Sequence, residues 1–514
     1  MQEDTQKRML IFFVAVSILV ASFSFFSSYL FPQPKEDTEN KQKTTAQTSQ
    51  AVQKIENYGD IDFLLGTQRQ STPKENIKIS TPDFDIQFTP YGGRITSIFV
   101  KRYNQDMISD YAKNSGIYPG DILTNDKNLT NILNLTKYEV KQSGNTITFS
   151  LKGDGFEIFK TYTLNNDGSI DIQLNSKGLE KYNLWYLSAL TLKSEGSFGH
   201  EGPIIKTKND ILKYSIDDIK STITINDKIL WAGEENKYFF QILSLKEGIS
   251  TVKIVPLNKD TTAVLVNIPS NFDGFVYGGA KLYSLLGDLT EKYEKNWNIN
   301  LDLRSSIDFG FFGIFGKPLF LLLHFFYEYI PNWGVAIIIL TVLIRIIFFP
   351  LNHKSLKAMK KMADLAPEME KLKKKYAKDP QKLQEEMMKL YAQAGANPLS
   401  GCLPILVQIP VFIALYNVLM VTVELKGAPF ILWIKDLSDK DPYYILPILM
   451  GLSMIAQQFI TPSTDKNQQI IMYVIAVVFT FMFLTFPSGL VLYWLTNNIL
   501  GLIQSFIVNK TMKK

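Results

Sequence analysis

The sequence predicts a polytopic α-helical membrane protein with a large all-β domain inserted after its first span. Three observations predict this fold class. Apolar segments long enough to cross a bilayer lie near the start of the chain and throughout its last third. Short runs of alternating polar and apolar residues, typical of strands, fill the region between them. The mean hydropathy near zero averages these two regions, and 514 residues are enough for more than one domain.

The first predicted span covers residues 9–31 and follows Lys7 and Arg8. Its apolar part is longer than that of a secretory signal, and the following SYLFPQPK contains no small-residue cleavage site. We therefore expect residues 1–31 to be an uncleaved anchor with a cytoplasmic N-terminus. Residues 32–56 are rich in Gln, Thr, Lys and Glu and almost lack large apolar side chains, so we expect a flexible tether.

Residues 57–300 are expected to form a large antiparallel β-sandwich. The strand-like runs are IKIS, FDIQF, TITFSLK, SIDIQL, STITI and STVKIVPL, separated by turn sequences such as YGG, KGDG, NNDG and SNFDG. A helix is expected to close the domain at KLYSLLGDLTEKYEKN. The sequence of the domain contains no metal-ligand cluster, nucleophile motif or phosphate-binding loop. We interpret its single histidine, His200, as structural or solvated, and the acid pairs Asp217–Asp218 and Glu234–Glu235 as solvated surface.

Residues 309–330 are apolar enough to span, but their polar residues favour a helix lying in the membrane interface. Lys317, His324 and Glu328 are seven and four residues apart, so they share one face of a helix. A second crossing here would also place the lysine-rich segment after Leu351 outside the cell, against the positive-inside rule. The next span is therefore expected at residues 331–351.

That span carries Arg345, an arginine with no acidic residue in the same apolar run to neutralise it. A guanidinium stays charged at any relevant pH, and its burial in hydrocarbon costs several kcal/mol. Two interpretations are open. Arg345 lies about six residues from the end of the span and could extend its side chain to the interface. Alternatively it faces a water-filled cavity together with Thr341, which lies four residues earlier on the same helical face.

Residues 352–396 carry eleven lysines against six acids and are patterned as a cytoplasmic hairpin of two helices, divided at Asp379-Pro380. Apolar residues recur every three or four positions. They are interpreted either as the seam of the hairpin or as an adaptable surface for apolar partners. The methionines in question are Met359, Met362, Met369 and Met387. The lysines fit anionic lipid headgroups or ribosomal RNA, or simply a solvated face.

Residues 397–508 contain four more expected spans, near 402–423, 443–461, 469–486 and 488–508. The connection PSG at 487–489 is so short that the last two must form a tight antiparallel pair. The basic tail, 509–514, then returns to the cytoplasm. Cys402, the one cysteine, is expected to be a packed apolar residue and not a redox centre.

Polar residues within these spans are few. Tyr493, Asn497 and Gln504 are spaced by four and seven residues and so share one side of the last helix, while Gln408 lies near the start of its own helix. If they converge with Thr341 and Arg345, they line a polar cavity in the cytoplasmic half of the bundle. The alternative is scattered interhelical hydrogen bonding.

Three long segments carry a resemblance to a known family: NPLSGCLPILVQIPVFIALYNVLM, APFILWIKDLSDKDPYYILPILMG and FPSGLVLYWLTNNILGLIQ. Together with the order of parts, they resemble the YidC membrane-protein insertases. The resemblance implies a five-helix core around a hydrophilic groove that is open to cytoplasm and lipid and closed toward the periplasm. It places the equivalents of Arg345, Thr341 and Gln408 in or near this groove.

The resemblance also implies that the β domain is a periplasmic β-supersandwich and that the spans near 402–423 and 469–486 contact emerging substrate helices. Two departures stand out. The segment IIMYVIAVVFTF lacks a proline expected in the fifth span, and Trp494 stands where a second tyrosine is common. The missing proline concerns a bend in that helix, and Trp494 concerns a detail of the groove wall.

The implied function is a membrane-protein insertase and chaperone that acts alone or with the Sec translocon. We expect no enzyme activity, catalytic residue, metal or other cofactor. The expected partners are nascent inner-membrane proteins, Sec components, the ribosome and lipid, without specific nucleic-acid binding, and the chain is expected to be monomeric. The expected location is the bacterial inner membrane, with both termini cytoplasmic.

Two other function classes are alternatives. A solute or anion transporter could use Arg345 as its anion site, but the sequence shows no inverted repeat, no second intramembrane charge and no pair of glycine-broken helices. An envelope protein whose β domain binds a glycan would not need six spans as an anchor. The sequence therefore favours the insertase.

Overall fold

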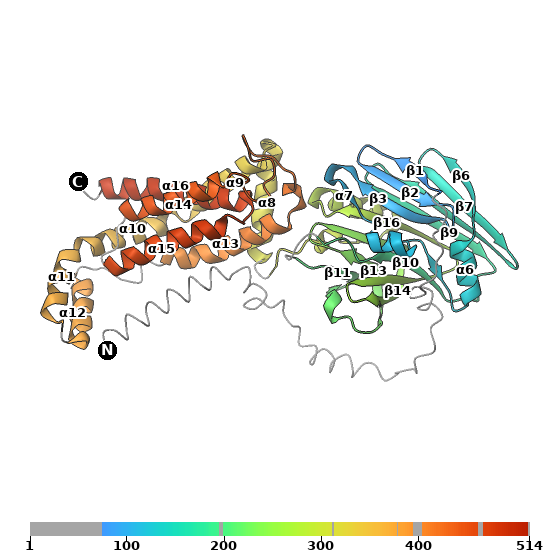
Figure 1. Cartoon of the computed structure of the whole chain (residues 1–514), viewed down its shortest axis with the longest axis horizontal. Coiled ribbons are helices and arrows are strands. Elements are labelled where there is room, and N and C mark those ends of the chain that lie inside the picture. Colours follow the sequence, from blue (N-terminus) through green and yellow to red (C-terminus); the bar gives the residue numbers. More distant parts are fainter. Residues whose placement is uncertain are drawn as a thin grey trace. The chain divides into compact units, whose positions relative to one another are not determined.

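The computed structural model describes residues 75–194, 199–310, 313–377, 379–393, 403–460 and 466–511. The expected N-terminal anchor and tether, and Cys402, lie outside these residues. The chain divides into two compact units, a β unit that ends at Asp308 and a helical unit formed by Phe309–Met420 and Glu424–Lys514. Figure 1 shows strands throughout the first unit and helices throughout the second.

The β unit contains a smaller and a larger antiparallel sheet (Figure 1). The smaller sheet has the order β1-β2-β3-β4, and the larger has the order β12-β11-β13-β14-β16-β9-β8-β7-β6 with β15, β10 and β5 branching from β14. The strands are β1 (Ile77–Ser80), β2 (Phe84–Thr89), β3 (Arg94–Val100), β4 (Gln105–Asp106), β5 (Ile122–Leu123), β6 (Glu139–Ser143), β7 (Thr146–Gly153), β8 (Phe156–Leu164), β9 (Ser169–Lys177), β10 (Leu184–Leu190), β11 (Gly202–Thr207), β12 (Ile211–Lys213), β13 (Ile223–Glu235), β14 (Phe239–Asn258), β15 (Thr261–Ile268) and β16 (Phe272–Ala280).

The long strand β14 explains how the larger sheet branches. Its first part, Phe239 to Leu245, pairs with β16, whereas its last part, Val252 to Asn258, pairs with β15. The bulges of β13 between Asn226 and Trp231 bend the ribbon between these two parts, because an extra residue on one strand increases the local twist. The prediction of an all-β antiparallel domain is confirmed.

Alternation of apolar and polar residues builds the core between the two sheets. In β7, Ile147 and Phe149 are fully buried, and Tyr162 of β8 is buried beside them. The ring of Phe88 in β2 lies 6.0 Å from that of Phe149 and 5.1 Å from that of Tyr162, so the smaller sheet packs on the larger one. Period-two alternation directs alternate side chains to this shared interior. Three helices complete the unit: α5 (Asp110–Ser115), α6 (Lys127–Leu135) and the expected closing helix α7 (Tyr283–Trp297).

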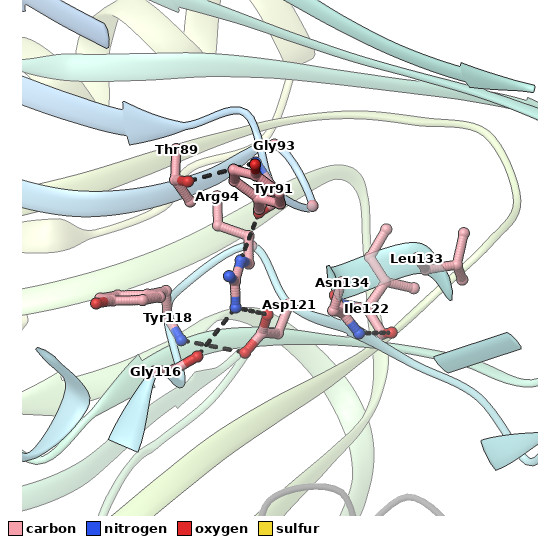
Figure 2. Close-up of polar contacts among 12 residues, drawn as sticks. Thr89, Tyr91, Gly93, Arg94, Gly116, Tyr118, Asp121, Ile122, Leu133 and Asn134 are labelled. Atoms are coloured by element: carbon pink, nitrogen blue, oxygen red, sulfur yellow. Dashed lines mark hydrogen bonds and ion pairs between the residues drawn. The ribbon is translucent and has the colours of Figure 1, made fainter. Parts of the chain in front are cut away.

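A buried ion pair joins β3 to the segment before β5. Arg94 and Asp121 are both fully buried, and Nη1 of Arg94 donates to Oδ1 of Asp121 at 3.1 Å and to the carbonyl of Gly116 at 3.0 Å. Figure 2 shows this guanidinium between Asp121 and the ring of Tyr118, with Nε donating to the carbonyl of Tyr91. Burial without such partners would cost each charge several kcal/mol.

Glu234 and Glu235 correct the expectation of a solvated acid pair, since neither is exposed. Glu235 accepts from Lys213 at 3.0 Å and Lys281 at 3.1 Å, and it contacts His200 at 2.9 Å. Burial alone would raise the pKa of Glu235, but these three groups hold it below its ordinary range. Burial raises the pKa of Glu234 well above its ordinary value. The strand β13 continues through Glu235, which pairs with Gly202 of β11 and Phe240 of β14 and is covered by these neighbouring strands. Asp217 and Asp218 are exposed, as expected.

Lys160 leads to a prediction on pH and stability. Its fully buried ammonium donates to the carbonyls of Gly92 and Gly120, and burial lowers its pKa to about 7. From about pH 7 to 10.5 the unfolded chain therefore holds a proton that the folded domain lacks. Stability should rise with pH in this window by at most about 1.4 kcal/mol per unit, and it should level off below pH 7, where both states are protonated.

The measurement is urea denaturation of the full chain in detergent at several pH values, beside Lys160→Met. The methionine variant fills the same space without a titrating group, so the rise assigned to Lys160 should be missing from it. Equal slopes for the two proteins would show that Lys160 does not titrate as described.

The helical unit begins with α8 (Gly313–Tyr329), on which His324 and Glu328 pair at 3.2 Å. Its other helices are α9 (Trp333–Ile347), α10 (Phe349–Asp364), α11 (Ala366–Lys375), α12 (Pro380–Gln393), α13 (Leu403–Val421), α14 (Ile445–Ile460), α15 (Lys466–Phe483) and α16 (Ser488–Thr511). By length and composition, and among the described residues, α16 could cross a membrane, as could α9 with the start of α10 taken as one span bent by 65°. Shorter apolar helices lie at Gln408–Val421, Ile445–Ile460 and Gln469–Phe483. The expected six spans stay a prediction.

Two expected boundaries in this unit are corrected. The helix expected to reach Leu351 ends at Ile347, where the chain bends at Phe348 into α10, and the extent of the membrane span stays a prediction. The lysine-rich region contains a further break at Leu365, so α10, α11 and α12 replace two helices. Pro367 explains the second break, because a proline near a helix start lacks the N–H that a continuing helix would need. The break before Pro380 lies where it was expected.

Candidate functional site in the helical unit

The candidate site lies where α9, α13, α14 and α16 approach one another near the lysine-rich helices. α9 leads into α10. The side chain of Gln504 in α16 donates to the carbonyl of Phe349 at the start of α10, at 3.4 Å. The amide of Asn509 donates at 2.9 Å to the carbonyl of Ile460, the last residue of α14. The C-terminal ends of α9, α14 and α16 therefore lie close together, next to the start of α10.

Arg345 lies in the last turn of α9 and reaches across to α16. Its Nη2 donates to the backbone carbonyl of Asn497 at 2.8 Å, while its Nε is buried without a hydrogen-bond partner among the described residues. The side chain is half-buried. Because no carboxylate pairs with it among the described residues, the guanidinium keeps its full positive charge between two helices.

Gly501 makes this reach possible. A Cβ atom at this position would lie 2.7 Å from Nη2 of Arg345, closer than real Cβ contacts. It would also lie 3.8 Å from Oε1 of Gln457 in α14, so the small residue marks the point where three helices bring polar groups together. Sequence reasoning missed Gly501, because a single glycine in an apolar span carries no distinctive signal.

Gln408 and Tyr493 form a second polar contact, between α13 and α16. Nε2 of Gln408 donates to the hydroxyl of Tyr493, which is almost fully buried. Tyr493 precedes Asn497 by one turn of α16, about 6 Å along the helix, and is close enough to Arg345 to interact electrostatically. The structure thus brings Arg345, Gln408, Tyr493 and the backbone of Asn497 into one region.

Thr341 and Gln504 lie differently from the expected lining. Thr341 is fully buried, and its hydroxyl donates at 2.6 Å to the carbonyl of Ile337 within α9. Gln504 is also buried and binds the bend between α9 and α10. Both side chains therefore satisfy backbone groups of the helical unit itself.

Further polar contacts between α14 and α16 were not anticipated. Gln457 donates to Ser505 at 2.9 Å, and Asn498 donates to Ser453 at 2.9 Å. Ser453 and Gln457 of α14 lie among large apolar side chains, so their segment was predicted only as an ordinary membrane span. Such bonds hold two membrane helices in register.

The methionines differ in their surroundings. Met369 of α11 is buried, and its sulfur accepts from the hydroxyl of Tyr391 in α12 at 3.2 Å. Met359 and Met387 are half-buried, and the side chain of Met362 lies outside the described residues. Met388, which was not singled out, is 55% exposed. Met369 therefore belongs to the seam between α11 and α12, whereas Met388 faces outward. No group of three potential metal ligands lies among the described residues.

Comparisons with known proteins cover both units. Residues 76–322 match the family model of the YidC periplasmic domain, and residues 325–514 match that of the 60Kd inner membrane protein. A protein of Aquifex aeolicus named membrane protein insertase YidC is 36% identical over 523 residues, covering 100% of this chain and 98% of its own length. A Geobacter sulfurreducens protein of the same name is 34% identical over 536 residues, covering 97% and 98%.

A solved structure described as an active YidC insertase with its first transmembrane domain resolved aligns with a TM-score of 0.43 and 20% identity, covering 86% of this chain and 95% of that one. The assignment to a family depends instead on the sequence matches, because they exceed 30% identity along nearly the full length of both relatives. From the matched models and these relatives, the chain belongs to the YidC family of membrane-protein insertases.

Proposed function

We propose that this insertase receives the polar tail of a nascent inner-membrane protein in a hydrophilic groove around Arg345, open to the cytoplasm and to lipid. The observation that carries the proposal is the contact of Nη2 of Arg345 with the carbonyl of Asn497 beside Gly501. It holds an uncompensated positive charge near the end of α9 that leads into the lysine-rich helices. Gln408 and Tyr493 add polar groups one turn away.

The groove would lower the barrier that a polar tail meets in hydrocarbon. In dry lipid an unsatisfied polar group costs several kcal/mol, so a wet recess shortens the dry distance. Acidic residues of the tail are attracted to Arg345 and are driven outward by the membrane potential, worth about 2.3 kcal/mol per charge per 100 mV. Insertion by this route needs no nucleotide.

The apolar segment of the client would leave sideways along α13 and α15. On α15, Ile470, Val474, Val477 and Phe481 are exposed and recur at intervals of four, three and four residues, so they form one apolar face. About twenty apolar residues of the client gain free energy by entering lipid next to such a face.

The remaining assignments follow the family and the charge distribution. We assign the chain to the inner membrane with its β unit in the periplasm, and its basic helices α10–α12 and both termini in the cytoplasm, an arrangement that the positive-inside rule supports. It folds clients as a chaperone and works alone or with the Sec translocon, as a monomer. The lysines of α10–α12, with Met388 exposed among them, are the surface we assign to ribosome or client contact.

Replacing Arg345 tests the function directly. In cells depleted of the native protein, Arg345→Ala should lower the insertion of a small client with a short acidic tail about tenfold or more, the loss expected for one charge-assisted contact. Protease protection of the client measures insertion. Arg345→Lys separates the effect of charge from that of guanidinium geometry, since rescue by lysine would show that charge is sufficient.

Arg102→Ala is the matched control, because this arginine is exposed on the β unit. It should insert the client normally. Normal insertion by Arg345→Ala, at equal protein level, would contradict the proposed groove.

A further inference from the structure

The connection between α13 and α14 presents apolar side chains outward. In the segment 428–444, the interface loop, Leu432 is 69% exposed, Tyr443 66%, Ile431 57% and Tyr444 39%. Most exposed apolar side chains of the helical unit lie on apolar helices, whereas these lie in irregular backbone. A loop usually presents polar residues to water, so this surface needs a physical explanation.

The backbone of the interface loop holds two of these residues in an unfavourable conformation. Leu432 has φ of +54° and Tyr444 has φ of +58°, in the left-handed region that favours glycine and asparagine. A large residue persists there when the surrounding structure determines the conformation, and such positions concentrate at functional sites. Glycine or asparagine at Leu432 would avoid the strain but would remove the apolar surface.

The carboxylate of Asp441 organises the interface loop. The carboxylate of Asp441 is 1% exposed and its Oδ1 accepts from the indole of Trp433 and from the backbone N–H of Tyr443, both at 3.0 Å. Its Oδ2 accepts from the N–H of Leu446 in the first turn of α14, at 2.7 Å. One carboxylate thus holds the apolar residues at both ends of the loop near the start of α14.

Other residues of the loop are hydrogen-bonded to the N-terminal ends of helices, at the end of the helical unit that lies away from α10. Asn332, the residue before α9, donates to the carbonyl of Phe430 at 2.9 Å. The N–H groups of Ser488 and Gly489, at the start of α16, donate to the carbonyls of Asp439 and Leu437. The loop therefore lies at the ends of α9, α14 and α16 opposite those that meet beside α10.

Helix length indicates what covers the apolar surface. α14 has 16 residues and α9 has 15, lengths of about 24 and 22 Å, whereas the hydrocarbon core of a bilayer is about 30 Å thick. At the other end of α9 only the apolar Ile346 and Ile347 follow Arg345, and the chain then bends by 65° into α10. The interface loop leads directly into α14 and is bonded to Asn332 before α9, so its apolar residues can fill the missing depth at these helix starts.

We propose that the interface loop is a membrane anchor: Ile431, Leu432, Tyr443 and Tyr444 insert among the headgroups and upper acyl chains of the leaflet opposite the lysine-rich helices. Tyrosine and tryptophan favour this depth because their rings are amphipathic. Lys435 and Lys440 are exposed in the same loop and remain at the level of the phosphates. The anchor would fix the height of α9 and α14, and hence of Arg345, in the bilayer.

Spin labels at single cysteines test the depth. In full-length Cys402→Ala protein, cysteines are placed at Leu432 or Tyr443, and at Lys435 or Asp439 as exposed controls in the same loop. The labelled proteins are reconstituted in vesicles of phosphatidylethanolamine and phosphatidylglycerol without any client. Labels at 432 and 443 should collide more with oxygen, which concentrates in lipid, and labels at 435 and 439 more with a water-soluble nickel complex. A water-like label at 432 would overturn the proposal and would favour a protein partner for this surface.

A second variant guards against local misfolding at the label. Leu432→Asn suits the left-handed backbone and removes the apolar side chain, so the label at Tyr443 should shift toward water. Lys435→Asn, the matched control, should leave its depth unchanged. An unchanged depth in Leu432→Asn would also contradict the anchor.

Discussion

Gly501→Ala is expected to reduce client insertion nearly as much as Arg345→Ala while leaving the protein folded. The added Cβ would lie 2.7 Å from Nη2 of Arg345, the far end of a flexible side chain, so the guanidinium moves and the helices stay. The lost bond to the carbonyl of Asn497 is a charge-assisted contact, and its loss corresponds to about tenfold or more in a binding equilibrium. Alanine also favours a helix interior over glycine by about 0.5–1 kcal/mol, which offsets part of the lost contact in the folding free energy.

The measurement combines client insertion with thermal unfolding in detergent. Gly313→Ala is the matched control, because a Cβ there would meet nothing nearer than 3.6 Å, at Phe309. It should insert the client normally. Unimpaired insertion by Gly501→Ala would show that the exact place of the guanidinium against α16 does not matter, and charge alone would then have to explain any effect of Arg345→Ala.

Asp121→Ala is expected to lower the free energy of unfolding of the β unit by about 3–5 kcal/mol. The substitution leaves the fully buried guanidinium of Arg94 without its carboxylate, and Nη2 of Arg94 already has no hydrogen-bond partner among the described residues. The backbone N–H of Tyr118 also loses its acceptor, Oδ2 of Asp121. Removing one partner of a buried pair costs far more than removing one partner of an exposed pair.

Urea denaturation of the full chain, followed through the buried tryptophans Trp185 and Trp231, measures the effect. Glu291→Ala breaks the exposed pair with Lys295 and should leave the midpoint unchanged. The double variant Arg94→Met with Asp121→Leu should recover much of the lost stability, because it removes both charges together. If Asp121→Ala proved as mild as Glu291→Ala, the pair would not carry the stability assigned to it.

Much of the fold followed from patterns that act over a few residues. The runs IKIS and FDIQF became β1 and β2, and the closing helix became α7 (Tyr283–Trp297), because alternation and helical periodicity are local properties. The break before Pro380 was likewise local, since proline lacks the N–H for a preceding turn. The break at Leu365 was missed although Pro367 lay in the sequence, because apolar residues at helical spacing continued across it.

Burial of charge was the least predictable property. The pair Glu234–Glu235 was expected to be solvated, but Glu235 binds Lys213 and Lys281, which lie 22 residues before it and 46 after it. Arg94 and Asp121 are separated by 27 residues. Such pairs form only when segments distant in sequence become neighbours, so local sequence patterns cannot predict them.

The sequence by itself indicated a helical membrane protein with an all-β domain, pointed to the family and singled out Arg345, because an intramembrane guanidinium is costly wherever the helix lies. Only the tertiary structure decided what Arg345 touches. In the folded protein Arg345 binds the backbone carbonyl of Asn497 and not its side chain, and Gly501 leaves room for the guanidinium. The hydroxyl of Thr341 bonds to a carbonyl within α9. The physical reason is that helical spacing defines which residues share a face of one helix. The packing of α9 against α16 defines which residues of α16 the guanidinium of Arg345 contacts and where there is space for it.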